Sequence, residues 1–131
     1  MKHYKFEATE KNLKGTITCG SKVGYEGDSK FDLTQVLDIL DQINKELNLE
    51  GIASIPCIVV EGELVGRSDL EKYREKIYNL NFAWCPRVPA PSTDDFYETL
   101  KQYVNRLGNK MQQERIYVEF EGDTVVYKRK D

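Results

Sequence analysis

Two polar loops, residues 20–27 and 85–89, carry the side chains best suited to bind a ligand. They offer two cations, an aromatic hydroxyl and a thiol: Lys22, Arg87, Tyr25 and Cys85. Each loop follows an expected strand and enters an expected helix, where free backbone amides and the helix dipole attract anions. The first loop lacks the glycine and lysine spacing of a phosphate-binding loop. The alternative is that its glycines only permit turns.

Cys85 is the thiol best placed for reactivity. Arg87 stands two residues further on, and a nearby cation lowers the pKa of a thiol by favouring the thiolate. The alternative is a small apolar residue that packs under Trp84 and Pro86. Cys57 lies within an apolar run and is expected in the core.

Arg67 is a further ligand-binding candidate. Arginines and tyrosines are favoured anchors of binding surfaces, and several stand close together in the chain: Arg67, Arg74 and Arg115, with Tyr73, Tyr78 and Tyr117. The alternative is that these arginines are ordinary surface residues.

Metal, nucleophile and cofactor sites find little support in the residue types. His3 is the single imidazole, and Cys19, Cys57 and Cys85 are widely and irregularly spaced. A zinc site needs about four cysteine or histidine ligands, and a Ser-His or Cys-His pair would need His3 itself. We therefore expect no metal, no cofactor and no catalytic residue, with reduced thiols in a cytoplasmic protein.

Charge and hydropathy exclude other classes. The 131 residues carry a net charge of −3, which argues against nucleic-acid binding because that affinity comes mainly from phosphate neutralisation. The basic run 128–130 precedes Asp131 and is expected to be a solvated tail rather than a phosphate-binding arm. No signal peptide and no membrane span are expected, since no stretch approaches roughly 20 apolar residues.

Two amphipathic helices are the clearest elements. Apolar residues at spacings of three and four predict a helix from about Asp32 to Leu49, with Asp32 as its N-cap and Gly51 as its stop. A second helix is predicted from about Thr93 to Met111. Ser92 or Thr93 can cap it, ahead of acidic residues in its first turn.

Strand patterns surround these helices. Residues 3–9 and 16–19 predict an N-terminal hairpin, and residues 77–84 a mixed strand. The apolar run 55–60 predicts a buried strand that turns at Glu61-Gly62-Glu63 and returns through 64–67. Residues 115–120 and 124–128 predict a hairpin around Glu121-Gly122-Asp123. The spacing of Leu70, Tyr73 and Ile77 allows a short helix across 68–76.

The chain has an internal repeat at an offset of 60 residues. Seven pairs are identical: Ile17 and Ile77, Leu40 and Leu100, Gln42 and Gln102, Leu47 and Leu107, Glu61 and Glu121, Gly62 and Gly122, Val65 and Val125. Helix faces, strands and Glu-Gly turns align in register, which favours duplication of a β-α-β-β unit. The alternative is two such units that look alike without a common origin. We expect one domain, 1–131, with halves at about 16–67 and 76–128.

These patterns predict an α+β fold: duplicated β-α-β-β units in a mostly antiparallel or mixed sheet, with two main helices on one face. This layout resembles the tautomerase superfamily, and the stretch from Val88 to Phe120 matches it best. The family's catalytic base is an N-terminal proline after the initiator methionine. Residue 2 here is Lys2, so tautomerase activity does not carry over. The glyoxalase type of fold also duplicates such a module, but its metal ligands would need more than one histidine.

We therefore expect a non-enzymatic, cytoplasmic binding module that self-associates through a sheet edge or face. Its ligand would be a small anion or a protein partner, bound at the loops before the two main helices. The alternative is a small tautomerase-like enzyme with another base, which would place Cys85, Tyr25, Arg87 or Arg67 in a cleft between subunits.

Overall fold

The computed structural model describes residues 2–22, 30–66 and 73–130. Its elements follow in the order β1 (Lys14–Gly20), α1 (Leu33–Leu49), β2 (Cys57–Gly66), β3 (Tyr73–Ala83), α2 (Thr93–Met111), β4 (Arg115–Phe120) and β5 (Asp123–Lys128). The fold class is the expected α+β type, with a five-stranded sheet in the order β2-β3-β1-β4-β5. The first four strands and two helices have the ferredoxin-like arrangement, to which β5 adds an edge strand.

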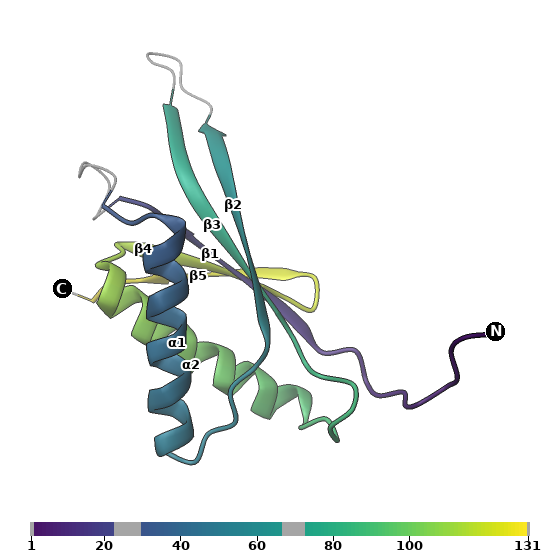
Figure 1. Cartoon of the computed structure of the whole chain (residues 1–131). Coiled ribbons are helices and arrows are strands. Elements are labelled where there is room, and N and C mark those ends of the chain that lie inside the picture. The colour runs from purple at the N-terminus through teal and green to yellow at the C-terminus, as the bar shows by residue number, and fades with distance from the viewer. Residues whose placement is uncertain (1, 23–29, 67–72, 131) are drawn as a thin grey trace.

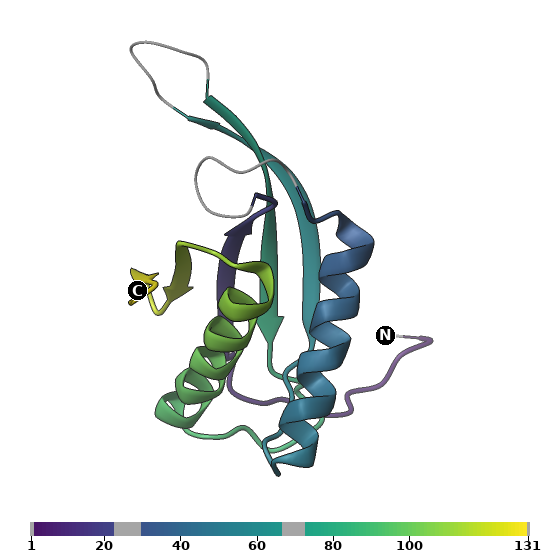
Figure 2. The ribbon, with the colours of Figure 1, turned by 90° about the vertical axis from the view of Figure 1, so that its left-hand side faces the viewer.

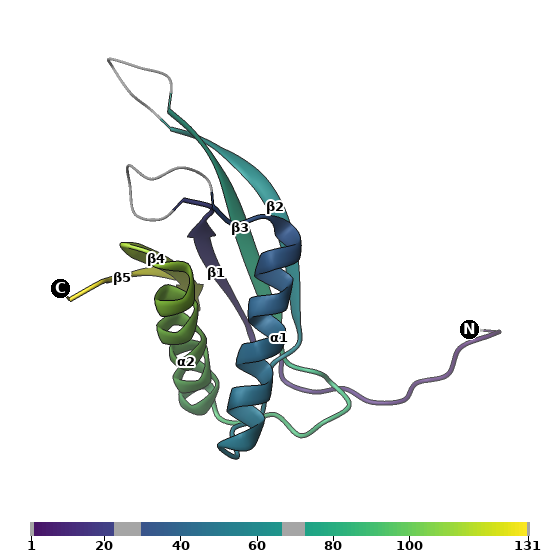
Figure 3. The same cartoon turned by 60° about the vertical axis from the view of Figure 1, so that its left-hand side comes forward.

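Every neighbouring pair of strands is antiparallel. Both helices lie on the same face of the sheet (Figures 2 and 3), and α1 and α2 run in opposite directions (Figure 1). The side chains at alternate strand positions therefore meet two different environments. Ile17, Leu80 and Val118 pack beneath the helices and are almost completely buried. We call the other, uncovered side of the sheet the open face.

Helix α1 begins where the sequence predicts. The Asp32 side chain accepts a hydrogen bond from the backbone N–H of Gln35, and the Gln35 side chain accepts one from the N–H of Asp32, each at 2.8 Å. This capping box satisfies two amides that would otherwise have no partner at the helix start. The helix then buries the predicted apolar stripe of Val36, Leu40, Ile43 and Leu47, while Leu37 stays exposed.

Helix α2 also has the predicted bounds, with Ser92 as its N-cap and Asp94 and Asp95 in its first turn. The two helices are joined by ion pairs around Arg106. Its guanidinium lies 2.7 Å from a carboxylate oxygen of Glu50 and 3.2 Å from one of Glu46, and Lys110 lies 2.8 Å from Glu46. Below them, the buried Tyr103 hydroxyl donates to Asn44 and accepts from the N–H of Ile55.

The predicted N-terminal hairpin is wrong. Residues 3–9 form no strand, and the segment before Leu13 is exposed and leads away from the rest of the fold (Figure 1). Strand β1 pairs instead with β3 and β4. The loose alternation of residues 3–9 has no sheet face to bury its apolar members, and Tyr4 and Phe6 are both 78% exposed.

The turn predicted at Glu61-Gly62-Glu63 is also wrong, because β2 continues unbroken to Gly66. Gly62 stands opposite Ile77 in the β2–β3 ladder. The matching Glu121-Gly122 pair does turn, with positive φ angles of 51° and 85° that join β4 to β5. The same dipeptide therefore follows its partner strand: the long β3 continues the pairing of β2. Tyr73–Lys76 belong to β3, not to a short helix.

The offset of 60 residues holds in three dimensions. Leu33 and Thr93 begin the two helices, and β1 and β2 correspond to parts of β3 and of the β4–β5 hairpin. Side chains from both halves share the buried core. Common descent of the halves remains an interpretation of this symmetry.

Candidate functional site

A cavity of about 600 Å³ opens at the end of the sheet where β1 stops. Most of the strand residues around it belong to the open face, and the connection between α2 and β4 completes its wall. Its lining combines apolar, aromatic and charged groups: Thr18, Cys19, Gly20, Leu64, Glu75, Ile77, Gln113, Glu114, Arg115 and Tyr117. A concave site with apolar walls and a few polar groups is the usual form of a small-molecule site. We call it the open-face pocket.

Gln113 fixes the wall of the open-face pocket. Its side chain is buried, and its amide makes hydrogen bonds in both directions with Gly20, accepting from the N–H at 3.0 Å and donating to the carbonyl at 3.2 Å. The same amide nitrogen donates to the carbonyls of Lys22 and Met111. A single side chain thus joins the end of β1 to the α2–β4 connection, so the pocket is held on a rigid support.

Glu75 lies across Gly20. A β-carbon added to Gly20 would overlap the Glu75 carboxylate. The absence of a side chain at Gly20 therefore gives the carboxylate its position over the end of β1. Glu75 stands opposite Leu64 in the ladder, so an apolar side chain lies beside it. The second carboxylate of the lining, Glu114, comes from the α2–β4 connection.

The remaining groups give the open-face pocket its chemical character. Two carboxylates, Glu75 and Glu114, accompany one cation, Arg115, while Leu64 and Ile77 contribute apolar surface. The Tyr117 ring is 43% exposed and offers an aromatic face. Such a lining suits a ligand with a flat ring, hydroxyl or ammonium donors and little negative charge.

Cys19 also contributes to this lining, but its thiol is not an activated nucleophile. Burial raises its pKa to about 12, and the charges of Cys57 and Glu75 add to the increase. Its sulfur lies 3.9 Å from the sulfur of Met111 in the core. The thiolate, which is the reactive form, is therefore scarce at neutral pH.

The predicted site residues do not gather in one place. Lys22 lies at the end of β1 that holds the open-face pocket, where its carbonyl accepts from Gln113. Cys85 and Arg87 follow β3. Because Lys14 stands opposite Ala83 and Gly20 opposite Ile77, the β3–α2 loop lies at the other end of the sheet. Tyr25 and Arg67 fall outside the described residues.

Cys85 and Arg87 do interact with each other. Hydrogen bonds from the backbone and then the side chain of Arg87, together with its charge, lower the pKa of the Cys85 thiol. The loop around them is shaped by Trp84, whose indole N–H donates to the carbonyl of Val88 at 3.0 Å. The pKa change expected from the sequence is therefore present, while ligand binding at this loop remains a prediction.

The sequence analysis missed most of the open-face pocket. It named Arg115 and Tyr117 only as interface residues, and it gave no role to Glu75, Gln113 or Glu114. The alternation of β4 could have placed Arg115 and Tyr117 on one face. Nothing in the local pattern distinguishes Gln113 from Gln112, which is exposed.

Within the described ranges, no three histidine, cysteine, aspartate or glutamate side chains gather in a way that could hold a metal ion. Among the same residues, no helix combines the length and apolar character needed to cross a membrane.

Two solved structures of a phage SAM lyase share this fold. The lyase in complex with S-methyl-5'-thioadenosine has a TM-score of 0.64 and 14% sequence identity, over 96% of this chain and 96% of that one. The apo lyase has a TM-score of 0.61 and 13% identity, over 91% of this chain and 90% of that one. No family model and no curated protein matches the sequence. The chain is thus similar to an enzyme in its fold.

Proposed function

We propose that this protein binds S-adenosylmethionine (SAM) in the open-face pocket and cleaves it to S-methyl-5'-thioadenosine. The observation that carries the proposal is the open-face pocket, with its two carboxylates and aromatic ring, on a fold shared with a SAM lyase over nearly the whole chain. A volume of about 600 Å³ lies in the range of small-molecule sites, roughly 300–1,000 Å³.

The cleavage needs no nucleophile from the protein. The α-carboxylate of SAM can attack its own γ-carbon, forming a C–O bond while the bond from that carbon to sulfur breaks. The electron pair passes to sulfur, which becomes the neutral thioether of S-methyl-5'-thioadenosine, and the four-carbon fragment leaves as a lactone with its ammonium group. No water or external base enters the balance. A chain with one histidine can therefore support the reaction through binding and positioning.

The lining residues have distinct roles in this proposal. Glu75 and Glu114 accept hydrogen bonds from the ribose hydroxyls or the ammonium group, and Tyr117 packs against the adenine ring. Gln113 is a positioning residue, because its amide is already committed to the backbone of Gly20 and Lys22. Leu64 and Ile77 exclude water near the sulfur. A less polar surrounding favours a step in which a carboxylate and a sulfonium neutralise each other.

The test is incubation of the purified chain with SAM, followed by chromatographic detection of S-methyl-5'-thioadenosine, alongside calorimetric titration with that product. Glu75→Gln and Glu114→Gln should weaken binding, whereas Glu119→Gln, on the exposed part of β4, should not. Product formation that is lost with Glu75 supports the proposal. No turnover and no binding by the unmodified chain would refute it. Binding without turnover would favour a non-enzymatic module.

Self-association through the open face forms part of the same proposal. The uncovered side of the sheet exposes Ile58, Val60, Leu64, Tyr117 and Val126. Exposed apolar surface of this extent marks interaction sites, and a second copy seated here would add a wall to the open-face pocket. Size-exclusion chromatography with light scattering should show an oligomer that Val126→Asp dissociates. A monomer at all concentrations would contradict self-association.

Binding of a small anion or a protein partner at the loops before the helices is the second candidate. It is favoured by the lowered pKa of Cys85 beside Arg87. Since Lys22 and Arg87 lie at opposite ends of the sheet, this reading requires two separate sites rather than one.

A further inference from the structure

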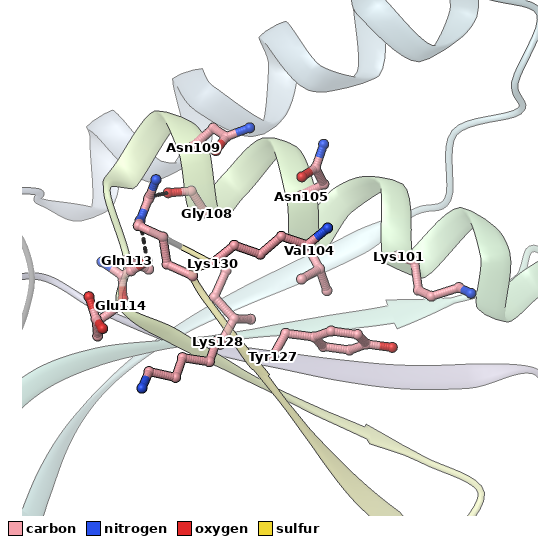
Figure 4. A pocket seen from close by; sticks show the side chains of 12 residues that line it. Lys101, Val104, Asn105, Gly108, Asn109, Gln113, Glu114, Tyr127, Lys128 and Lys130 are labelled. Atoms are coloured by element: carbon pink, nitrogen blue, oxygen red, sulfur yellow. Dashed lines mark hydrogen bonds between the residues drawn. The ribbon is translucent and has the colours of Figure 1, made fainter.

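A second cavity, of about 460 Å³, lies between α2 and the end of β5 (Figure 4). It is on the helix-covered side of the sheet, since its strand residues Ile116 and Tyr127 face α2. Val104, Gly108 and Ile116 supply its apolar floor. We call it the α2–β5 pocket. It shares Gln113 and Glu114 with the open-face pocket but opens on the opposite face.

The polar groups of the α2–β5 pocket are arranged along the helix. Lys101, Asn105 and Asn109 follow one another at intervals of four residues, so they form one row on α2. From the strand side, Lys130 extends along α2 toward Asn105, whereas Lys128 points away (Figure 4). Two ammonium groups and two amides therefore border one apolar floor.

Arg129 anchors the end of the α2–β5 pocket. Its guanidinium donates to the carbonyl of Gly108 at 2.7 Å and to that of Gln113 at 3.2 Å. These carbonyls belong to the last turn of α2 and the residues after it, where the helix dipole is negative. Arg129 offsets that negative end, and its backbone N–H donates to the carbonyl of Glu114. The segment that carries Lys130 is thereby held against the helix instead of forming a solvated tail.

The charge of the α2–β5 pocket is opposite to that of the chain. Its lining includes Lys101, Lys128, Arg129 and Lys130 but, among the described residues, a single carboxylate, Glu114. The whole protein has a net charge of −3. Lys101 is paired with Glu98 at 2.6 Å, so Lys130 is the main cation available to a ligand.

We propose that the α2–β5 pocket binds a small organic phosphate. The phosphate accepts hydrogen bonds from Lys130, Asn105 and Asn109, and the apolar part of the ligand covers Val104 and Ile116. Charge-assisted hydrogen bonds to phosphate are among the stronger polar contacts. The volume of about 460 Å³ suits a small molecule of this kind.

The test uses phenyl phosphate as the probe, titrated into the full ¹⁵N-labelled chain and followed by amide chemical shifts. We expect saturable shifts at Asn105, Gly108, Asn109 and Lys130, weaker binding of inorganic phosphate, and none of phenol. Lys130→Ala should reduce the affinity for phenyl phosphate about tenfold. Lys45→Ala, an exposed lysine on α1, is the matched control and should leave it unchanged.

Three outcomes would overturn the proposal. They are equal weakening by Lys130→Ala and Lys45→Ala, shifts centred on Arg115 and Tyr117 in the open-face pocket, and the lack of saturation with any of the probes at millimolar concentration. Asn109→Ala gives an independent check, because it removes an amide donor without changing the charge.

Discussion

The side-chain amide of Gln113 makes hydrogen bonds to both backbone groups of Gly20, at 3.0 Å and 3.2 Å. Two segments 93 residues apart are thus joined by one side chain at the edge of the open-face pocket. Gln113→Ala would leave buried backbone groups without partners and should lower the free energy of unfolding by about 1–3 kcal/mol. Urea denaturation measures this, with Gln42→Ala on the exposed side of α1 as control. Equal stability of the two variants would contradict the role assigned to Gln113.

Gly20→Ala should weaken ligand binding in the open-face pocket. The new methyl group would overlap the Glu75 carboxylate and force it to move. Because a glutamate side chain is flexible, we expect the fold to persist, while affinity for S-methyl-5'-thioadenosine falls about tenfold through the loss of a charged hydrogen-bond acceptor.

Gly62→Ala is the matched control for Gly20→Ala. Both glycines point to the open face, but a methyl group at Gly62 would meet Ile77 Cδ1 at an ordinary 3.5 Å. Calorimetric titration of both variants should separate them. Unchanged affinity in Gly20→Ala would remove Glu75 from the binding site.

Tyr103→Phe should destabilise the protein through its hydroxyl alone. This hydroxyl accepts from the N–H of Ile55 at 3.0 Å and donates to Asn44 at 2.6 Å, in a fully buried position. Removing it leaves the Ile55 donor unpaired, which costs about 1–3 kcal/mol. Thermal unfolding of this variant can be compared with that of Tyr4→Phe, where the ring is exposed. A loss no larger than that of Tyr4→Phe would contradict the prediction.

Arg106 should give the protein a pH-dependent stability. The pKa of Glu46 is lowered mainly by the hydrogen bond from Lys110, with Arg106 contributing, and that of Glu50 mainly by the hydrogen bond from Arg106. A carboxylate whose pKa is lower in the folded state stabilises it at neutral pH, and this contribution is lost as the pH falls through the folded pKa.

The test of this pH dependence is urea denaturation of Arg106→Met at several pH values. The variant should be less stable than the unmodified chain at neutral pH. The difference should shrink as the pH falls below the range where free glutamate titrates, about 4.3. Lys45→Met controls for the loss of a positive charge on a helix. A difference independent of pH would point to packing of the Arg106 stem rather than to its ion pairs.

Cys85 should be the first thiol to react with iodoacetamide. Its pKa is lowered by Arg87, whereas burial raises the pKa of Cys19 and of Cys57 to about 12. Arg87→Gln removes the cation and its side-chain hydrogen bond, so the midpoint of the alkylation rate against pH should move upward. Mass spectrometry of the peptides identifies the modified site, and Cys85→Ser should remove the fast phase. An unchanged midpoint in Arg87→Gln would contradict the role of this side chain.

Local sequence patterns determined the two helices and their caps. The apolar stripe of α1, the Asp32 and Ser92 caps and the bounds of α2 depend on interactions within a few residues, which the sequence displays directly. The same holds for the β4–β5 hairpin, because Glu121 and Gly122 adopt the positive φ angles that its turn requires. The offset of 60 residues also predicted that both helix starts are equivalent.

Long-range pairing decided what the sequence could not. Glu61-Gly62 has the same residue types as Glu121-Gly122, but it lies opposite β3 and stays extended. The antiparallel pairing of β1 with β3 sends their following loops to opposite ends of the sheet, which separates Lys22 from Cys85 and Arg87. The open-face pocket combines β1, β2, β3 and β4 with the α2–β4 connection. Its key contacts, Gln113 with Gly20 and Glu75 over Gly20, join residues far apart in the chain, so only the tertiary structure brings them together.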